Sequence, residues 1–265
     1  MKIPLYQVDS FARRPFAGNP AAVCALESWI YDVTLQQIAS ENNMPATAFI
    51  VPRKDEFEIR WFSPVREIEL CGHGTLAAGW VALTHLVPKR QVVRFSWRAG
   101  ELRVERDPVA DGRLTLALPR RSPAPPTALP PALTSALGHA PDLVLTSGTS
   151  WLCVYDDAKS VANLTPDFAA LRANELSVIA TASGGAYDCD FVSRYFAPAH
   201  GHDEDAVTGS AHCLLVPYWA DKLKRDSLFA KQISERGGEL WCRLAQKDVF
   251  LSGYVAPYFV GELDF

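Results

Sequence analysis

Two short segments of the chain carry side chains that could move a proton. The first places a thiol, an imidazole and a hydroxyl among glycines, in the order Cys71-Gly72-His73-Gly74-Thr75. The second places a carboxylate and two hydroxyls together, in the order Asp205-Ala206-Val207-Thr208-Gly209-Ser210. Such groups are common general acids and bases. Together they could shift a proton next to a polarised carbon without any metal.

Each segment runs into an apolar stretch that is predicted to be helical, over residues 75–86 and 211–221. The first N–H groups of a helix lack intrahelical partners and lie at the positive end of its dipole, where a carboxylate binds readily. We therefore expect a small carboxylic acid to be held between the two helix starts. The backbone positions expected to bind it are Gly72, Gly74 and Thr75 in the first segment and Thr208, Gly209 and Ala211 in the second.

A repeated pattern, arginine-aromatic-Phe-small-proline, precedes both segments. The copies are Arg60-Trp61-Phe62-Ser63-Pro64 and Arg194-Tyr195-Phe196-Ala197-Pro198, and an acidic residue follows each. Taken alone, a Gly-His-Gly run is more often a turn, and Thr208 to Ser210 could be a simple helix cap. Their matched placement after the repeat favours a functional role. It also predicts two similar lobes facing each other across a cleft.

The elements around these segments mix strands with two long apolar helices. Strands are predicted at residues 5–8, 21–25, 47–51, 57–62, 92–97, 100–106, 113–118, 143–146, 151–155, 177–181, 191–196, 229–234, 239–244 and 248–252. Shorter helices are predicted at residues 34–41, 131–137 and 167–174. A proline-rich stretch from Pro119 to Pro131 reads as a linker. The expected division is an N-terminal lobe at 1–118 and a C-terminal lobe at 119–265, with the last strand a candidate to return to the N-terminal lobe.

Composition favours a small-molecule partner. The 265 residues are 48% hydrophobic, with a net charge of -4 and no basic run longer than a pair, so neither a nucleic acid nor an anionic membrane is expected as a partner. The N-terminus reads as a strand, and no apolar run approaches about 18 residues, which favours a cytoplasmic protein. The six cysteines form no Cys-x-x-Cys pair, so neither a disulfide framework nor a structural zinc site is indicated.

The stretch from His200 to Asp205 also suggests a metal site, because imidazoles and carboxylates at this density can bind zinc or iron. A metal-dependent hydrolase using His200 and His202 is therefore a third reading. A solvated acidic loop explains the same residues without a ligand, and we expect no metal and no cofactor.

Over nearly its full length the chain resembles the phenazine-biosynthesis isomerase-like (PhzF-type) family, which shares the fold of diaminopimelate epimerase. Four stretches carry the resemblance: residues 8–23, residues 62–75 from Phe62-Ser63-Pro64 to Cys71-Gly72-His73-Gly74-Thr75, residues 204–212, and residues 234–238. The resemblance implies an α+β fold of two lobes, each a barrel-like, mostly antiparallel sheet around a central helix. It also implies an active site between the lobes, no cofactor or metal, and a homodimer.

The family's site residues can be carried over position by position. His73, Asp205 and Ser210 match its imidazole, carboxylate and hydroxyl, and Asn19, which lies in its Gly-Asn-Pro turn, is expected to bind the substrate. The essential base of members that isomerise a dihydro-hydroxyanthranilate is a glutamate, and here Ala46 stands in its place. Diaminopimelate epimerase uses two opposed cysteines. Cys71 matches the first, whereas Ala206 or a neighbour stands where the second would be.

The leading hypothesis is a metal-free and cofactor-free isomerase, acting by proton shift or epimerisation on a small carboxylic acid. Cys71 or Asp205 would transfer the proton, with His73 and Ser210 orienting and protonating. A thiol at a helix N-terminus can have its pKa lowered toward neutrality, which would suit Cys71 as the base. The alternative is a binding or regulatory protein that keeps the fold and the acid-binding cleft but has lost catalysis.

Overall fold

The computed structural model describes the backbone of all 265 residues and every side chain except that of His200. The chain forms two compact units. Unit 1 comprises Met1–Leu118 and Phe250–Phe265, and unit 2 comprises Pro119–Val249. No helix in the described chain is long and apolar enough to cross a membrane.

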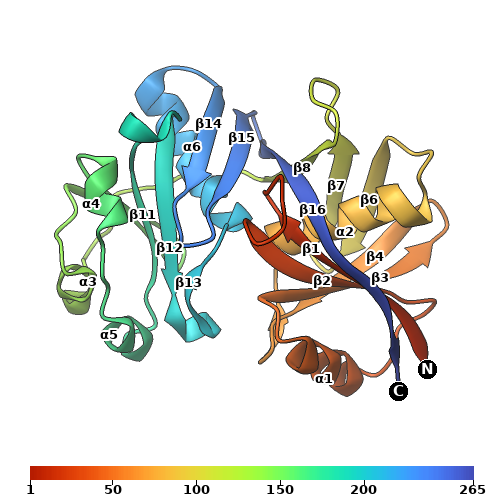
Figure 1. Ribbon diagram of the computed structural model, residues 1–265. Helices are drawn as coiled ribbons and strands as arrows, with labels where there is room; N and C mark the ends of the chain where they lie inside the picture. The colour runs from red at the N-terminus through yellow and green to blue at the C-terminus, as the bar shows by residue number, and fades with distance from the viewer. The chain divides into compact units, whose positions relative to one another are not determined.

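Unit 1 is a closed barrel of eight strands (Figure 1). The strands follow one another in the order β1-β2-β3-β4-β6-β7-β8-β16, and β1 also pairs with β16 to close the ring. Two neighbouring pairs are parallel, β2 with β3 and β4 with β6. The strand bounds are β1 Lys2–Ser10, β2 Asn19–Ala25, β3 Ala46–Arg53, β4 Glu56–Phe62, β6 Val92–Trp97, β7 Gly100–Arg106, β8 Arg113–Pro119 and β16 Asp248–Asp264. A short strand off this path, β5 (Glu67–Ile68), pairs with β4.

One helix of unit 1 lies inside the barrel and another lies outside it (Figure 1). The inner helix, α2 (Gly72–Val81), is followed by a single π-helical turn, Ala82–Leu86. It packs so closely on β7 that a Cβ at Gly79 would lie 2.4 Å from Val104, which explains a glycine there. The outer helix, α1 (Asp32–Asn42), packs on outward-facing residues of β3 such as Phe49.

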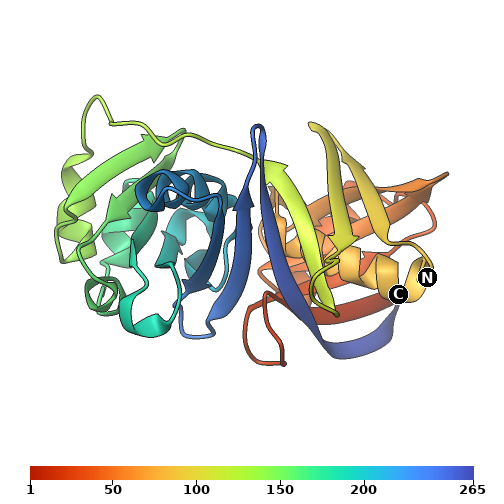
Figure 2. The ribbon, with the colours of Figure 1, turned by 90° about the horizontal axis from the view of Figure 1, so that it is seen from above.

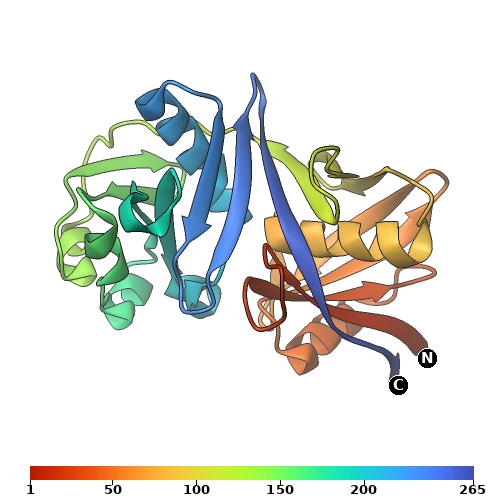
Figure 3. The same ribbon diagram turned by 45° about the horizontal axis from the view of Figure 1, so that its top comes forward.

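The last strand is much longer than the sequence pattern predicts. The prediction ends it at Ser252, whereas β16 continues to Asp264 and pairs with all of β1, which brings the two chain ends side by side (Figure 3). Gly253, Pro257 and Gly261 in this stretch are residue types that ordinarily interrupt a strand. Instead, Pro257 pairs opposite Val8, the next residue, Tyr258, is the extra residue of a β-bulge, and the pairing resumes with Phe259 opposite Gln7.

Unit 2 repeats the element order of unit 1 as an open sheet around α6 (Gly209–Leu223), which Figure 2 shows framed by its strands. The order is β9-β10-β11-β12-β14-β15, and the parallel pairs again fall second and fourth, β10 with β11 and β12 with β14. The strands are β9 Leu143–Ser147, β10 Ser150–Val154, β11 Ser177–Ser183, β12 Phe191–Ala197, β14 Ser227–Gln232 and β15 Gly238–Leu244. The short strand β13 (His202–Asp205) pairs with β12 as β5 pairs with β4. Three short helices cover the core, α3 Pro131–Leu137, α4 Ala158–Ala162 and α5 Phe168–Ala173. The fold class expected from the sequence is confirmed.

Candidate functional site

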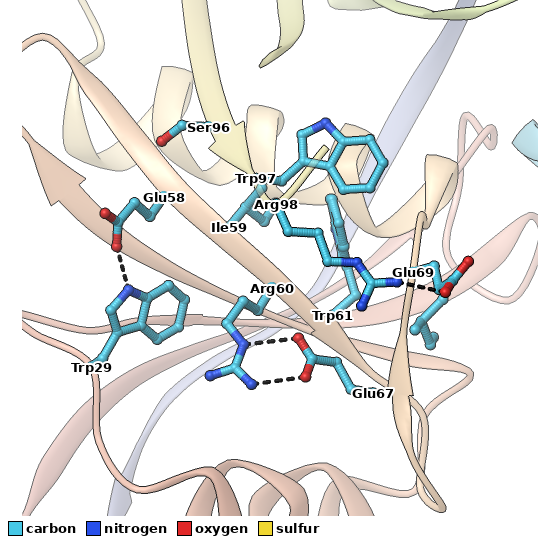
Figure 4. A pocket seen from close by; sticks show the side chains of 11 residues that line it. Trp29, Glu58, Ile59, Arg60, Trp61, Glu67, Glu69, Ser96, Trp97 and Arg98 are labelled. Carbon is cyan, nitrogen blue, oxygen red and sulfur yellow. Dashed lines mark hydrogen bonds and ion pairs between the residues drawn. The ribbon is translucent and has the colours of Figure 1, made fainter. Parts of the chain in front are cut away.

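The repeated sequence pattern builds the same clamp in both units. Arg60 in β4 makes two parallel hydrogen bonds of 2.8 Å to Glu67 in β5 (Figure 4). Arg194 in β12 makes two bonds of the same length to Glu204 in β13. In each unit the clamped glutamate stands four residues before the position that precedes the central helix, Cys71 or Thr208. The repeat therefore fixes the short strand that leads into each helix start.

At the start of α2, the Cys71 thiol lies beside the imidazole of His73. Its Sγ is 3.6 Å from Nδ1 and 3.8 Å from Nε2 of that ring. Cys71 makes no side-chain cap to the helix, and its carbonyl accepts hydrogen bonds from the Thr75 amide at 3.0 Å and the Thr75 hydroxyl at 2.6 Å. Only 5% of Cys71 and 7% of His73 are exposed. The thiol and the imidazole thus form one nearly buried pair.

The loop between β1 and β2 fixes the orientation of His73. Gly18 in this loop has a φ of +67°, and a Cβ there would lie 2.2 Å from the Ser10 carbonyl oxygen, so a glycine is required. Asn19 follows and places its Nδ2 3.2 Å from His73 Nδ1, while the Ser10 hydroxyl donates to the His73 carbonyl at 2.9 Å. Because an amide nitrogen only donates, His73 Nδ1 is the acceptor in this contact.

Three side chains surround Gly74 next to this pair. Measured from the position that a Cβ would take at Gly74, Cys71 Sγ and Trp61 Cδ1 each lie at 3.0 Å and Ala46 Cβ lies at 3.5 Å. Ala46 is fully buried. The ionisable group of this cluster is therefore the Cys71 thiol, which lies close to the methyl group that stands where the family resemblance expects a carboxylate.

The start of α6 is held differently from a capped helix. Thr208 makes no side-chain cap, since its hydroxyl donates to the Asp205 carboxylate at 2.6 Å. The Thr208 amide donates to Gln232 Oε1 at 2.8 Å, and Gln232 Nε2 donates to the Asp205 carbonyl at 2.7 Å. Ser234 also donates to the Ala206 carbonyl at 2.7 Å. The Thr208 side chain is therefore not a simple helix cap, because its hydroxyl is engaged by Asp205.

The predicted site residues gather in two groups, one in each unit. Unit 1 brings together Asn19, Cys71, Gly72, His73, Gly74 and Thr75, and unit 2 brings together Asp205, Thr208, Gly209, Ser210 and Ala211. That both groups serve one substrate stays a prediction. Sequence reasoning missed Gln232, whose role depends on the register of β14, although the resemblance at residues 234–238 begins two residues later.

A cavity of about 350 Å³ opens in unit 1 beside β4 and β5 (Figure 4). Aromatic side chains and paired charges line it, among them Trp29, Arg60, Trp61, Glu67, Trp97 and Arg98. Arg60 pairs with Glu67 and Arg98 pairs with Glu69 at 2.5 Å. None of the predicted site residues lines this cavity, so it is separate from the start of α2, and Trp61 lies between the two.

The described side chains provide no ligand set for the metal site that the sequence suggests. Among them, no group of three or more His, Cys, Asp or Glu residues is placed to hold a metal ion. The side chain of His200 lies outside the described part, and His202 opens β13. Metal independence stays a prediction.

Comparison with known proteins finds likeness over the whole chain. A family model described as phenazine biosynthesis-like protein (PhzC-PhzF) matches residues 8–254. An uncharacterized isomerase of Pseudomonas aeruginosa is 45% identical over 263 residues, covering 99% of each chain. The crystal structure of a PhzF-family protein from Enterococcus faecalis superposes with a TM-score of 0.92, 39% identity and full coverage of both chains.

A more distant likeness concerns the fold alone. A hydroxyproline epimerase from Agrobacterium vitis, solved with trans-4-hydroxy-L-proline, shares 10% identity and a TM-score of 0.60, covering 99% of this chain and 92% of its own. The family resemblance and the epimerase-like fold expected from the motifs are both confirmed.

Proposed function

Because the chain belongs to the phenazine biosynthesis-like family, we propose that it is a cofactor-independent isomerase that shifts a proton on a small carboxylic acid. One observation carries the proposal beyond the family. The Cys71 thiol lies at the start of α2, 3.6 Å from His73 and beside Ala46, where the family resemblance expects the glutamate base. A thiolate is both a base and a nucleophile, and a helix start favours its charge.

In the proposed reaction, the Cys71 thiolate removes a proton from a carbon next to the carboxyl group. The C–H electron pair stays on the substrate, and the new S–H bond holds the proton. The thiol then returns the proton at a second carbon on the same face of the substrate, which regenerates the thiolate. His73 orients the sulfur, which lies 3.6 Å from its Nδ1 and 3.8 Å from its Nε2, and Asn19 holds the ring by donating to Nδ1.

We also propose a role for the start of α6 in unit 2. The Thr208 side chain is turned to Asp205, so it leaves the first-turn amides of α6 for a substrate carboxylate. Ser210, in that same turn, would orient the substrate with its hydroxyl. Asp205 is the other candidate base, but the Thr208 hydroxyl already occupies one of its oxygens at 2.6 Å, which favours Cys71.

The test is proton exchange with solvent. The protein is incubated in D₂O with small carboxylic acids, and deuterium uptake at carbon is followed by NMR. Since a general base contributes on the order of a hundred- to ten-thousand-fold, Cys71→Ala should lower the exchange rate by that factor. Cys213→Ala, which removes a buried thiol within α6, is the matched control and should retain exchange.

The other outcomes separate the alternatives. Exchange that survives Cys71→Ala but is lost in Asp205→Asn would assign the base to Asp205. Tight binding of acids without exchange would favour the non-catalytic binding or regulatory role. The observation behind that role is that Ala46 has a methyl group where the family resemblance expects a carboxylate. The unmodified chain should have little activity on a dihydro-hydroxyanthranilate, and Ala46→Glu should raise it.

A further inference from the structure

Trp61 carries a buried hydrogen-bond donor with no acceptor. Its side chain lies on the inner face of the barrel and is 2% exposed. Its Nε1 is buried and has no hydrogen-bond partner among the residues that the structure describes. A buried indole N–H ordinarily has a partner, because leaving it unpaired costs free energy. Such a donor is therefore expected to meet an acceptor that the protein itself does not supply.

The edge of the indole that carries this donor faces the start of α2. Cδ1, which is bonded to Nε1, lies 3.0 Å from the Cβ position of Gly74, and Cys71 and Ala46 contact the same position. Trp61 stands opposite Ala48 in the register of β3 and β4, so two alanines on one face of β3, Ala46 and Ala48, leave room for the ring. Trp97 packs against the ring at a centroid distance of 5.8 Å (Figure 4).

We propose that the Trp61 indole N–H donates a hydrogen bond to an oxygen of the substrate that lies over the Ala46 methyl group. This inference rests on the proposed function and deepens it. A glutamate at position 46 would direct its own carboxylate toward the same cluster, where it could accept from Trp61. With Ala46 in place, the acceptor comes from the substrate.

The pairing of donors defines the substrate class. The first-turn amides of α2, next to Trp61, accommodate one carboxylate. Trp61 adds a separate donor beside Cys71, and a donor in a nearly water-free site discriminates strongly against a ligand that leaves it unpaired. The substrate is therefore an acid with a second acceptor oxygen, such as a dicarboxylic or oxo acid, and a monocarboxylic acid of equal length binds more weakly.

Calorimetric titration with succinate and butyrate tests this, because the two acids have the same chain length and differ in one terminal carboxylate. The unmodified protein should bind succinate at least about tenfold more tightly than butyrate, as a charge-assisted hydrogen bond predicts. Trp61→Phe keeps a ring but removes the N–H, so it should abolish that preference. Trp97→Phe is the matched control, since it alters the neighbouring ring, and the preference should remain.

A spectroscopic readout separates hydrogen bonding from packing. The ¹H–¹⁵N indole resonance that disappears in Trp61→Phe should move downfield with succinate and stay in place with butyrate. The Ala46→Glu variant is a second test, and it does not require the Trp61→Phe variant to fold. Its carboxylate should occupy the acceptor position and lower succinate affinity about tenfold while leaving butyrate unchanged.

Three results would overturn the proposal: a succinate preference that persists in Trp61→Phe, an indole resonance that does not respond to succinate, or equal binding of both acids by the unmodified protein. Calorimetry needs no turnover. A failure here therefore leaves the proton-exchange test standing, and loss of exchange in Cys71→Ala with an intact succinate preference would speak only for the base.

Discussion

Burial keeps the five cysteine thiols other than Cys71 protonated. It raises the pKa of Cys24, Cys153 and Cys213 to about 12, and it raises the pKa of Cys242 further. Cys189 is partly exposed, yet desolvation still raises its pKa to about 11. A thiol with a pKa of 11 is about one part in a thousand ionised at pH 8. Among the six cysteines, Cys71 is the one that combines a helix start with a neighbouring imidazole.

We predict that iodoacetamide modifies Cys71 first. Near neutral pH its labelling should precede that of the other five cysteines, and a small dicarboxylate should protect it, because the proposed ligand covers the thiol. Mass spectrometry of partly labelled protein gives the order. Cys189 is the stringent internal comparison because it is the more exposed thiol. Labelling of Cys189 ahead of Cys71 would favour Asp205 as the base, or the non-catalytic role.

His212 is the other unusual residue at this scale. It lies fully buried in α6, where its Nδ1–H donates to the Thr208 carbonyl at 2.8 Å. Burial lowers its pKa from 6.5 to about 4. The unfolded chain therefore takes up a proton in a pH range where the folded chain does not. The stabilisation is complete above about pH 6.5 and is lost as the pH falls toward 4.

We predict that lowering the pH from 7 to 5 costs about 2 kcal/mol of stability through His212. Urea unfolding at both pH values measures it. His212→Asn, which keeps a short donor near Thr208 but does not titrate, should lower stability at pH 7 and reduce the difference between the two pH values. His139→Asn changes a residue outside the buried set and should leave that difference as it is. An unchanged difference in His212→Asn would assign the pH dependence to other groups.

At the scale of elements, the arginine clamps hold the short strands β5 and β13 that lead into the starts of α2 and α6. Arg194 Nη1 also donates to the carbonyls of Val161, Ala162 and Leu164 at the end of α4, whereas Arg60 Nη1 donates to the Asp32 carboxylate of α1 at 2.7 Å. The Arg194 side chain is 13% exposed, against 26% for Arg60. The clamp in unit 2 thus joins β12, β13 and α4 around one buried guanidinium.

We predict that Arg194→Lys destabilises the protein by roughly 2 kcal/mol, because lysine cannot reproduce the bidentate geometry. Arg60→Lys should cost less, since that pair is more exposed. Urea denaturation compares them, with Lys224→Ala as the control on an exposed ion pair that should leave the midpoint in place. Equal effects of the two arginine variants would show that the contacts to α4 contribute little.

The sequence pattern predicted most elements but placed the helix starts too late. Glycine is a poor helix former, so residues 72–74 and 209–210 read as turns, whereas α2 begins at Gly72 and α6 at Gly209. Tertiary burial inside the sheets overrides that propensity. The short strands β5 and β13 were not predicted, because strands of two and four residues are too short to show an alternating pattern of apolar and polar residues. Trp61 and Gln232 could not be assigned to the site, since strand register alone brings them there.

At the scale of the whole molecule, unit 1 is built from two distant parts of the chain. Residues 250–265 supply the strand that pairs with β1 along its full length, from Lys2 opposite Asp264 to Ser10 opposite Val255. Removing this strand opens the barrel and exposes two edges, those of β1 and β8. Unit 2 is continuous in sequence and keeps the pairings among β9, β10, β11, β12, β14 and β15.

We predict that deletion of residues 253–265 unfolds unit 1 and leaves unit 2 folded. Limited proteolysis with mass spectrometry should show early cuts within residues 1–118 and protection within 119–249. Deletion of Phe265 alone, which is 55% exposed, is the control and should behave as the full chain. Protection of residues 1–118 in the longer deletion would mean that the remaining seven strands are stable without closure.

The position of β16 in the sequence also determines when the barrel of unit 1 can close during synthesis. A ribosome releases the whole of residues 1–118 well before the strand that closes their barrel, while residues 119–249 emerge as an uninterrupted unit. The half made first is thus finished last, contrary to the usual N-to-C order of domain folding. During that interval β1 and β8 have unpaired edges. The nascent chain is therefore exposed to strand-edge aggregation until β16 has been synthesised.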